Sequence, residues 1–287
     1  MEQTVIKLAI QKKGRLSEKT IELLKNCGIK FVSKSSSLKT QAFNFPMEIL
    51  FLRDDDIPGY VADGVADFGI LGMNEIDEKD KDVNVIKKLG FSKCRLSIAV
   101  PNSFDYTGIQ SLEGKKIATS YPTILGKYLK SEGVNAHIHE IGGSVEIAPT
   151  IGLTDAICDL VSTGGTLLSN GLKEVEVIYK SESALIGNKN LSHEKIELLN
   201  KWLLRIDAVY KAQNYKYILM NVPHYALDTV TQLLPGMKSP TITPLKEEGW
   251  SSIHSVIHED EFWDIIEKVK DAGAEGILVC PIEQMIL

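Results

Sequence analysis

The segment 155–167, DAICDLVSTGGTL, is the most informative part of the sequence, because an apolar run ends there in five small residues. The run predicts a buried strand, and a new helix is expected to begin after the small residues. Glycine lets backbone N–H groups turn toward an anion, and the hydroxyls of serine and threonine add further donors. The turn is therefore a candidate phosphate-binding loop without a lysine, and its members are Ser162, Thr163, Gly164, Gly165 and Thr166.

Two carboxylates belong to the same segment. On a strand, Asp155, Ile157 and Asp159 alternate onto one face, which would set both carboxylates beside the loop. Two carboxylates beside a bound phosphate are unfavourable unless a cation or sugar hydroxyls lie between them, and a ribose phosphate carrying Mg²⁺ meets that condition. An ordinary glycine-rich turn, whose aspartates cap or are solvated, remains the alternative.

Strand and helix patterns alternate almost throughout the chain on both sides of this segment. A helix-to-strand segment at 57–67 is loosely repeated at 145–155, which indicates two α/β lobes of similar construction, each with a parallel sheet. The chain is expected to cross between the lobes near Arg95 and Tyr179. A ligand between two such lobes would lie at the carboxyl ends of their strands.

The C-terminal part of the chain has a different pattern. Residues 215–287 follow the order strand, helix, strand, strand, helix, strand, which is typical of a ferredoxin-like domain. We therefore predict an α/β protein with a two-lobed core like that of periplasmic binding proteins and a C-terminal ferredoxin-like (βαββαβ) domain. The first lobe is expected to comprise residues 1–94 plus 180–212, and the second lobe residues 95–179.

The composition is that of an ordinary globular chain. Its 287 residues are 44% hydrophobic and 24% charged, which excludes a disordered or collagen-like protein. A formal net charge of −6 argues against nucleic acid or an anionic membrane as a partner. The sequence contains no run of roughly 18 apolar residues for a spanning helix and no signal-peptide pattern at its start, so we expect a cytoplasmic protein. The four cysteines form no CxxC pair, which favours reduced, buried thiols.

Basic residues near strand ends form a second candidate site. The loop 12–15, KKGR, follows the first predicted strand, and Arg53 and Arg95 lie at the end and the start of two others. Cations that converge on a cleft would suit a triphosphate or another polyanion, whereas each one alone is ordinary surface charge. Glu146 and Tyr121 are weaker candidates, since a single glutamate near a helix start commonly reflects the helix dipole.

On these residues the chain resembles the ATP phosphoribosyltransferases of the long, histidine-regulated form, over essentially its whole length. The most specific stretches are GRL at 14–16, RDDDIP at 53–58, CRLS at 94–97, ATSYP at 118–122, and GSVEIAP at 143–149 continuing to DLVSTGGTL at 159–167. The resemblance implies an enzyme that joins N1 of the adenine of ATP to C1 of phosphoribosyl pyrophosphate and releases pyrophosphate. That reaction is the first step of L-histidine biosynthesis.

The resemblance also implies roles for particular residues. Together with Asp159, the loop 162–166 would hold the 5′-phosphate of phosphoribosyl pyrophosphate. The catalytic acidic residues would be Asp155, Asp159 and Glu146. The ATP side maps more loosely, onto Gly14, Arg15, Arg53, Arg95, Ser97 and Tyr121. The C-terminal domain would be regulatory and would bind L-histidine through Thr241, Asn221 and Met237. Mg²⁺ would be the cofactor, and dimers of the chain would assemble into hexamers, which L-histidine favours in an inactive state.

Two other classes of protein share some of these features. Solute-binding proteins also have two α/β lobes with a cleft between them and carry out no chemistry. A catalytically silent regulatory partner is a further alternative, although the loop 162–166 is intact. A phosphate-binding loop beside paired aspartates favours the enzyme.

Overall fold

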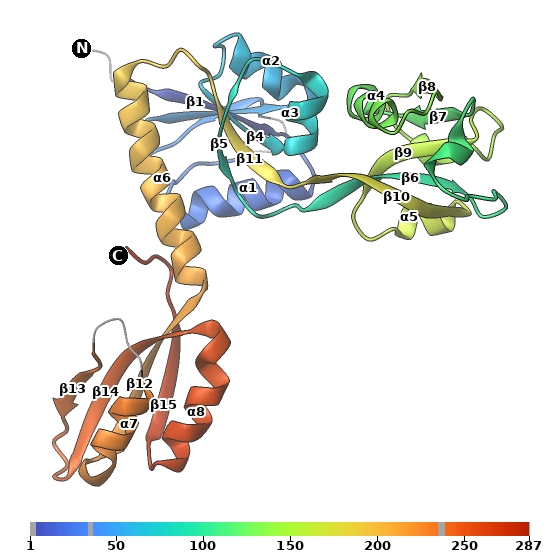
Figure 1. Ribbon diagram of the computed structural model, residues 1–287. Helices are drawn as coiled ribbons and strands as arrows, with labels where there is room; N and C mark the ends of the chain where they lie inside the picture. Colours follow the sequence, from blue (N-terminus) through green and yellow to red (C-terminus); the bar gives the residue numbers. More distant parts are fainter. Residues whose placement is uncertain (1–3, 34–36, 235–238, 287) are drawn as a thin grey trace. The chain divides into compact units, whose positions relative to one another are not determined.

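The computed structural model describes residues 4–33, 37–234 and 239–286, and the chain divides into two compact units (Figure 1). Unit 1 contains the residues up to Glu22 together with Ile29–Ile196, and unit 2 contains Leu23–Gly28 together with the residues from Glu197 onward. Among the described residues, no helix is long and apolar enough to cross a bilayer. The domain boundaries expected above stay predictions.

The first lobe of unit 1 is a six-stranded sheet with the strand order β2-β3-β1-β4-β11-β5. Its strands are β1 (Ile6–Gln11), β2 (Lys39–Gln41), β3 (Met47–Leu52), β4 (Phe68–Gly72), β5 (Asn84–Lys88) and β11 (Ser183–Gly187). Its helices are α1 (Arg15–Asn26), α2 (Ile57–Ala62) and α3 (Met73–Lys79). Strand β1 is parallel to β3 and β4, and every residue of β4 is buried, as expected for a central strand covered on both faces.

The second lobe is a five-stranded sheet with the strand order β10-β6-β9-β7-β8. Its strands are β6 (Cys94–Pro101), β7 (Lys116–Thr119), β8 (His137–Glu140), β9 (Ala156–Val161) and β10 (Leu172–Ser181). Its helices are α4 (Pro122–Ser131) and α5 (Gly165–Ser169). Strand β6 carries the chain into this lobe and β10 carries it out again (Figure 1).

Both sheets are mixed, so the expectation of a parallel sheet in each lobe is wrong. Strands β7, β8 and β9 are parallel, but β6 is antiparallel to both β9 and β10. Strand β11 is antiparallel to β4 and β5 in the first lobe. The reason is the way in which the chain returns from the second lobe to the first. Strands β10 and β11 are separated by a single residue, so β11 enters the first sheet directly as an extended strand. It therefore runs opposite to strands such as β1 and β4, which are connected through helices.

The two faces of the second sheet have separate cores, and this alternation orients the residues of β9. Cys158 packs in the cluster that contains α4, whereas Ile157 and Val161 pack in the cluster that contains Leu167 of α5. Because side chains alternate along a strand, Asp159 shares its face with Ile157 and Val161. The strand thus directs Asp159 to the side on which the small-residue loop turns into α5.

Helix α3 of the first lobe joins the two lobes through carboxylates. Glu78 is buried and accepts hydrogen bonds from the backbone N–H groups of Thr123 (2.8 Å) and Ile124 (3.0 Å) in the first turn of α4. These N–H groups have no partner within their own helix, so Glu78 serves as the cap that α4 lacks. Asp77 accepts a hydrogen bond from the hydroxyl of Tyr179 on β10.

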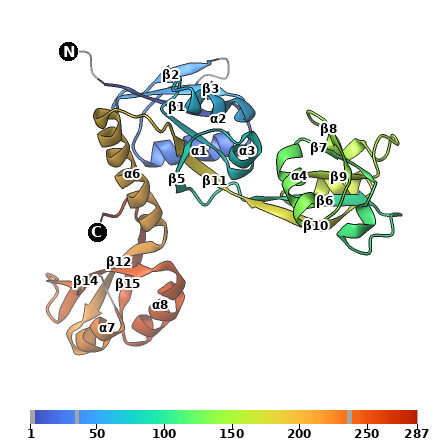
Figure 2. The same cartoon turned by 45° about the horizontal axis from the view of Figure 1, so that its top comes forward.

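Unit 2 contains most of the long helix α6 and a four-stranded antiparallel sheet with the order β13-β14-β12-β15. Its elements are α6 (His193–Gln213), β12 (Tyr215–Pro223), α7 (Leu227–Leu233), β13 (Thr241–Pro244), β14 (Trp250–His258), α8 (Phe262–Asp271) and β15 (Glu275–Pro281). Alternate residues of β12 and β14 share one core with α7 and α8. Figure 2 shows the two helices beside this sheet. This order of elements and strands is the ferredoxin-like βαββαβ arrangement, so that part of the predicted fold is confirmed.

The Glu78 cap yields a prediction about stability. Glu78→Ala leaves two N–H groups of α4 without a partner, one buried and one partly buried, and is expected to lower the free energy of unfolding by about 2 kcal/mol. Urea unfolding followed by circular dichroism measures the change. Glu132→Ala at the exposed C-terminal end of the same helix is the control and should change the free energy by less than about 0.5 kcal/mol. Equal effects of the two substitutions would contradict a capping role for Glu78.

Candidate active site

The small-residue loop lies where the central strand β9 ends and α5 begins. Gly164 has φ +82°, a left-handed conformation that residues with a Cβ rarely adopt, and it is the residue before the first turn of α5. The loop lines a cavity of about 300 Å³, to which it contributes Ser162, Thr163, Gly164 and Thr166. Gly165, the remaining predicted member, is not among the lining residues. Four of the five predicted loop residues thus face one cavity.

Two carboxylates line the same cavity. Asp159 comes from β9, and Glu146 comes from the short 3₁₀ turn Val145–Ile147. Burial raises the pKa of Asp159, and the charge of Glu146 raises it further. A hydrogen bond from the backbone N–H of Leu160 to Asp159 Oδ1, 2.7 Å long, acts in the opposite direction on this pKa. The cavity therefore combines hydroxyl and backbone donors with two carboxylates held close together.

Asp155 does not join this group, so the expectation that it lies beside the loop with Asp159 is wrong. It precedes β9, and its carboxylate accepts a hydrogen bond from the backbone N–H of Lys116 (2.8 Å) at the start of β7. Four residues of extended strand span roughly 13 Å, which sets Asp155 and Asp159 near opposite ends of β9. The distance along the chain therefore separates the two carboxylates.

Arg15 connects the loop cavity with a larger, central cavity of about 410 Å³, because it lines both. It is the first residue of α1, and Gly14 before it has φ +103°. The central cavity is also lined by Gln11, Asp54 and Glu75 from the first lobe and by Leu160 and Ser162 from the second. Both lobes of unit 1 therefore contribute to it.

Arg95 and Ser97 are held by a carboxylate of their own lobe. Arg95 donates to Glu174 through Nε (2.5 Å) and Nη2 (2.6 Å), and the Ser97 hydroxyl donates to the same carboxylate (2.7 Å). The Arg95 guanidinium holds the pKa of Glu174 below its usual range. Arg95 Nη1 donates to the backbone carbonyl of Ser162 (3.1 Å), so this pair positions the small-residue loop.

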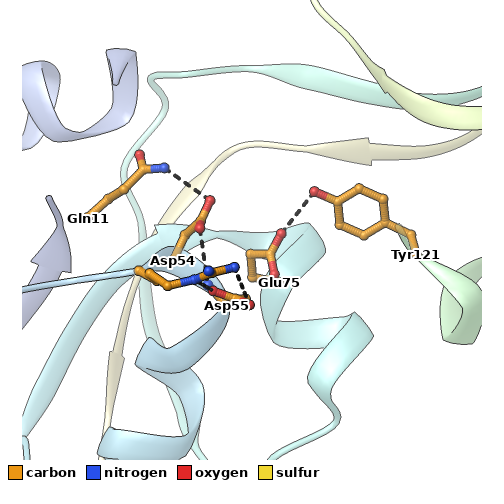
Figure 3. Close-up of polar contacts among 6 residues, drawn as sticks. Gln11, Asp54, Asp55, Glu75 and Tyr121 are labelled. Atoms are coloured by element: carbon orange, nitrogen blue, oxygen red, sulfur yellow. Dashed lines mark hydrogen bonds and ion pairs between the residues drawn. The ribbon is translucent and has the colours of Figure 1, made fainter. Parts of the chain in front are cut away.

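The other two residues predicted for ATP, Arg53 and Tyr121, do not line the loop cavity or the central cavity. The Arg53 side chain is 78% exposed and pairs with Asp55 at 3.0 Å. Tyr121 is buried at the start of α4, and its hydroxyl donates to Glu75 Oε1 at 2.9 Å. Figure 3 shows Tyr121 directed toward Glu75, with Gln11 hydrogen-bonded to Asp54 nearby (3.0 Å).

Glu75 and Asn74 were missed by the sequence analysis. Both are buried in α3 and line the central cavity, and the Asn74 side chain donates to Glu75 Oε1 at 3.0 Å. Burial raises the pKa of Glu75, and the hydrogen bond from Tyr121 partly offsets this increase. The sequence carries only a weak signal for this role, since an acidic residue in the first turn of a helix is common for electrostatic reasons alone.

The residues predicted to contact an effector lie on the sheet of unit 2. Thr241 is exposed on the edge strand β13, and Asn221 is half-buried on β12. The two strands are separated by β14, where Thr241 pairs with His254 and Asn221 with Ser252. The structure therefore sets them on one sheet but not side by side. Met237 lies outside the described residues.

Comparisons with known proteins agree with the two-lobed architecture. A solved substrate binding protein of an amino acid ABC transporter is similar to 73% of this chain and 95% of its own, with 16% identity and a TM-score of 0.50. Identity that low concerns the fold alone. The fold thus defines the core as a two-lobed α/β protein with cavities lined from both lobes.

The particular family follows from closer relatives. Residues 53–208 match the family model described as ATP phosphoribosyltransferase, and residues 212–284 match the model described as HisG, C-terminal domain. The ATP phosphoribosyltransferase of Cytophaga hutchinsonii is 60% identical over 283 residues, 99% of each chain. A solved ATP phosphoribosyl transferase (HisG:HisZ) complex from Thermotoga maritima has 31% identity and a TM-score of 0.61 over 70% of this chain and 96% of that one.

The chain belongs to the ATP phosphoribosyltransferase family, in the long form that carries the C-terminal regulatory domain. It is accordingly an enzyme, a transferase of histidine biosynthesis, and the non-catalytic alternatives raised from the sequence are not supported.

The raised pKa of Asp159 predicts how stability depends on pH. A carboxyl whose pKa is higher in the folded than in the unfolded chain binds more protons when folded, so stability falls as pH rises between the two pKa values. Asp159→Asn keeps an acceptor for the Leu160 N–H but removes the buried charge. The variant is therefore expected to be more stable than the wild type at pH 8, with a smaller difference at pH 4.5.

Urea unfolding at both pH values measures this difference. Glu140→Gln, on the exposed edge strand β8, is the control and should show no comparable gain at pH 8. A loss of stability in Asp159→Asn at pH 8 would contradict the conclusion that burial disfavours the Asp159 carboxylate.

Proposed function

We propose that the cavities described above are the active site in which N1 of the adenine of ATP is joined to C1 of phosphoribosyl pyrophosphate, with release of pyrophosphate. The reaction is the first step of L-histidine biosynthesis. The observation that carries the proposal is the loop cavity of about 300 Å³, in which small-residue donors, two carboxylates and Arg15 meet. Such a set suits a ribose 5-phosphate group, which presents a phosphate dianion together with the hydroxyls of the sugar ring.

The loop 162–166 binds the 5′-phosphate of phosphoribosyl pyrophosphate. Ser162, Thr163 and Thr166 offer hydroxyl donors, and the glycine backbone at Gly164 allows close approach of the chain to the anion. Arg95, bound to the carbonyl of Ser162, acts as a positioning residue that keeps the loop in place.

Asp159 and Glu146 act on the ribose. Breaking the bond between C1 and pyrophosphate leaves positive charge on the sugar ring, so a fixed carboxylate stabilises the transition state more than the neutral ring. The geometry supports Asp159 and Glu146 in this role over Asp155, whose carboxylate is engaged at the start of β7. No covalent intermediate is required.

ATP occupies the central cavity. Adenine N1 is a weak nucleophile, so its position relative to C1 matters more than a strong base. Gln11, Asn74 and Glu75 supply amide and carboxylate groups that can hydrogen-bond the edge of a base, and Arg15 lies at the junction with the loop cavity. Gly14 gives the loop before α1 its left-handed turn. Ser97 and Tyr121 act as positioning residues: Ser97 donates a hydrogen bond to Glu174, and Tyr121 donates one to Glu75.

Mg²⁺ fits this site as an ion that arrives with substrate phosphates. Among the described residues, no group of three or more histidine, cysteine or acidic side chains is arranged to hold a metal alone. Mg²⁺ commonly binds one or two carboxylates together with substrate phosphates, and Asp159 and Glu146 provide such a pair beside the loop. When bound, the ion offsets the negative charge of the departing pyrophosphate.

Regulation is assigned to the C-terminal domain, which binds L-histidine with Thr241 and Asn221 as candidate contacts. The chain forms dimers that assemble into hexamers, and L-histidine favours an inactive hexamer. The match of residues 212–284 to the family's C-terminal domain supports this proposal.

The direct test is the absorbance change that accompanies substitution at adenine N1, measured with ATP, phosphoribosyl pyrophosphate, Mg²⁺ and a pyrophosphatase, with and without L-histidine. A signal that needs both substrates and is suppressed by L-histidine supports the proposal. Turnover that is absent under these conditions counts against it.

Asp159→Asn is expected to lower kcat by about 100-fold, because one fixed charge at a reacting centre is worth on the order of two to three powers of ten in rate. Asp155→Asn is the matched control from the other end of β9 and should lower kcat by less than about fivefold, since it loses no contact with the loop cavity. A larger loss for Asp155→Asn than for Asp159→Asn would reverse the assignment.

Thr241→Val in the full chain is expected to raise the L-histidine concentration for half-inhibition by about tenfold, because a lost polar contact costs on the order of 1 kcal/mol or more. Turnover without L-histidine serves as the internal reference. Thr243→Val, on the same strand, is the control; equal sensitivity of the two variants to L-histidine would remove Thr241 from the effector site.

A further inference from the structure

A third cavity of about 410 Å³ lies at the strands that cross between the lobes of unit 1. It is lined from β5, from the turn between β5 and β6, and from β6 and β10. Four of its lining side chains are cations, Lys88, Lys93, Arg95 and Lys180, and one is an anion, Glu182. We call it the crossover pocket. In a chain with a formal net charge of −6, this is a marked local excess of positive charge.

Two of the four cations are paired and two are not. Lys88 forms an ion pair with Glu182 at 3.5 Å, and Arg95 binds Glu174. Lys93 and Lys180 form no ion pair within the part of the chain that the structure describes. Both are exposed, so they are available to a ligand in the pocket.

The crossover pocket adjoins both parts of the proposed active site. It shares Lys93, Cys94 and Ser162 with the central cavity and Ser162 with the loop cavity. Any group bound in it would thus be continuous with a substrate in those cavities. Since the central cavity carries the amide and carboxylate groups that suit a base, the cationic pocket suits the negatively charged part of a substrate.

We infer that the crossover pocket binds a polyphosphate group of a substrate, with Lys93 and Lys180 as its phosphate ligands. The inference rests on the proposed function, which supplies two substrates with such a group. The sources are the triphosphate tail of ATP and the pyrophosphate of phosphoribosyl pyrophosphate, and the chemistry that recognises them is the same. Neither lysine belongs to the stretches that carry the family resemblance.

The test uses the full chain with Lys180→Gln, Lys93→Gln and the double variant. Calorimetry measures binding of AMP, ADP and ATP, and of inorganic tripolyphosphate as a probe without a base. Initial-rate kinetics measures the KM for phosphoribosyl pyrophosphate. Lys173→Gln is the matched control, because it removes the same charge from β10 at a position that does not line the pocket.

Each single substitution is expected to weaken binding of tripolyphosphate by about fivefold, and the double substitution by about twentyfold, as for exposed lysines that contact phosphate. If the source is ATP, the loss grows from AMP through ADP to ATP while the KM for phosphoribosyl pyrophosphate stays within twofold. If the source is phosphoribosyl pyrophosphate, its KM rises and the three nucleotides are affected alike and weakly. Either pattern supports the pocket as a polyphosphate site.

Tripolyphosphate binding that is unchanged in the double variant, or weakened equally by Lys173→Gln, overturns the inference. Wild-type chain that binds no tripolyphosphate overturns it as well. The binding arm is independent of turnover. If no product forms but lysine-dependent polyphosphate binding is measured, the proposed reaction fails and the pocket stands.

Discussion

The cap that Glu78 provides for α4 is the interaction on which the catalytic unit depends. The loop cavity and the central cavity are lined by side chains from both lobes, so they exist only while the lobes hold one arrangement. Three carboxylates of helix α3 fix that arrangement by accepting hydrogen bonds from the second lobe. Glu78 accepts from N–H groups of α4, Glu75 from the Tyr121 hydroxyl, and Asp77 from the Tyr179 hydroxyl. In each contact, the hydrogen bonds compensate the carboxylate for the hydration that it loses. They are also more directional than a hydrophobic contact would be.

The same use of carboxylates explains how an acidic chain can build a site for anions. The Arg95 guanidinium is engaged within the chain. It donates two hydrogen bonds to Glu174 and a third to the backbone carbonyl of Ser162. A guanidinium held in this way has little rotational freedom left to lose, and its hydrogen bond fixes one carbonyl of the loop. Three cations that line the cavities have no such partner among the residues that the structure describes, and they remain available to substrate: Arg15, Lys93 and Lys180.

Much of the fold and part of the site could be predicted from local patterns. Arg95 was expected at the start of a strand, and β6 begins one residue before it, at Cys94, because an apolar run bounded by Pro101 has few alternatives. The small-residue loop could be predicted because five small residues directly follow an apolar run. Asp155 was misplaced because alternation reveals the face of a strand but ignores distance along it, and four residues of strand separate Asp155 from Asp159 by roughly 13 Å. Its partner, the backbone N–H of Lys116, lies 39 residues away in the sequence. The partners Glu75 and Tyr121 are 46 residues apart, and no local pattern joins them.

Asp159 illustrates a conflict between stability and catalysis within one side chain. Burial and the charge of Glu146 both raise its pKa, so the folded protein resists the ionised form that the proposed chemistry requires. Arg15, on the far lobe, is the single cation that lines the loop cavity among the described residues, and it must offset two carboxylates as well as the phosphate of a substrate. The negative charge therefore exceeds the positive charge that the chain itself supplies. A substrate that brings its own divalent cation restores the balance, which makes Mg²⁺ binding with the phosphates, rather than to a preformed protein site, the consistent arrangement.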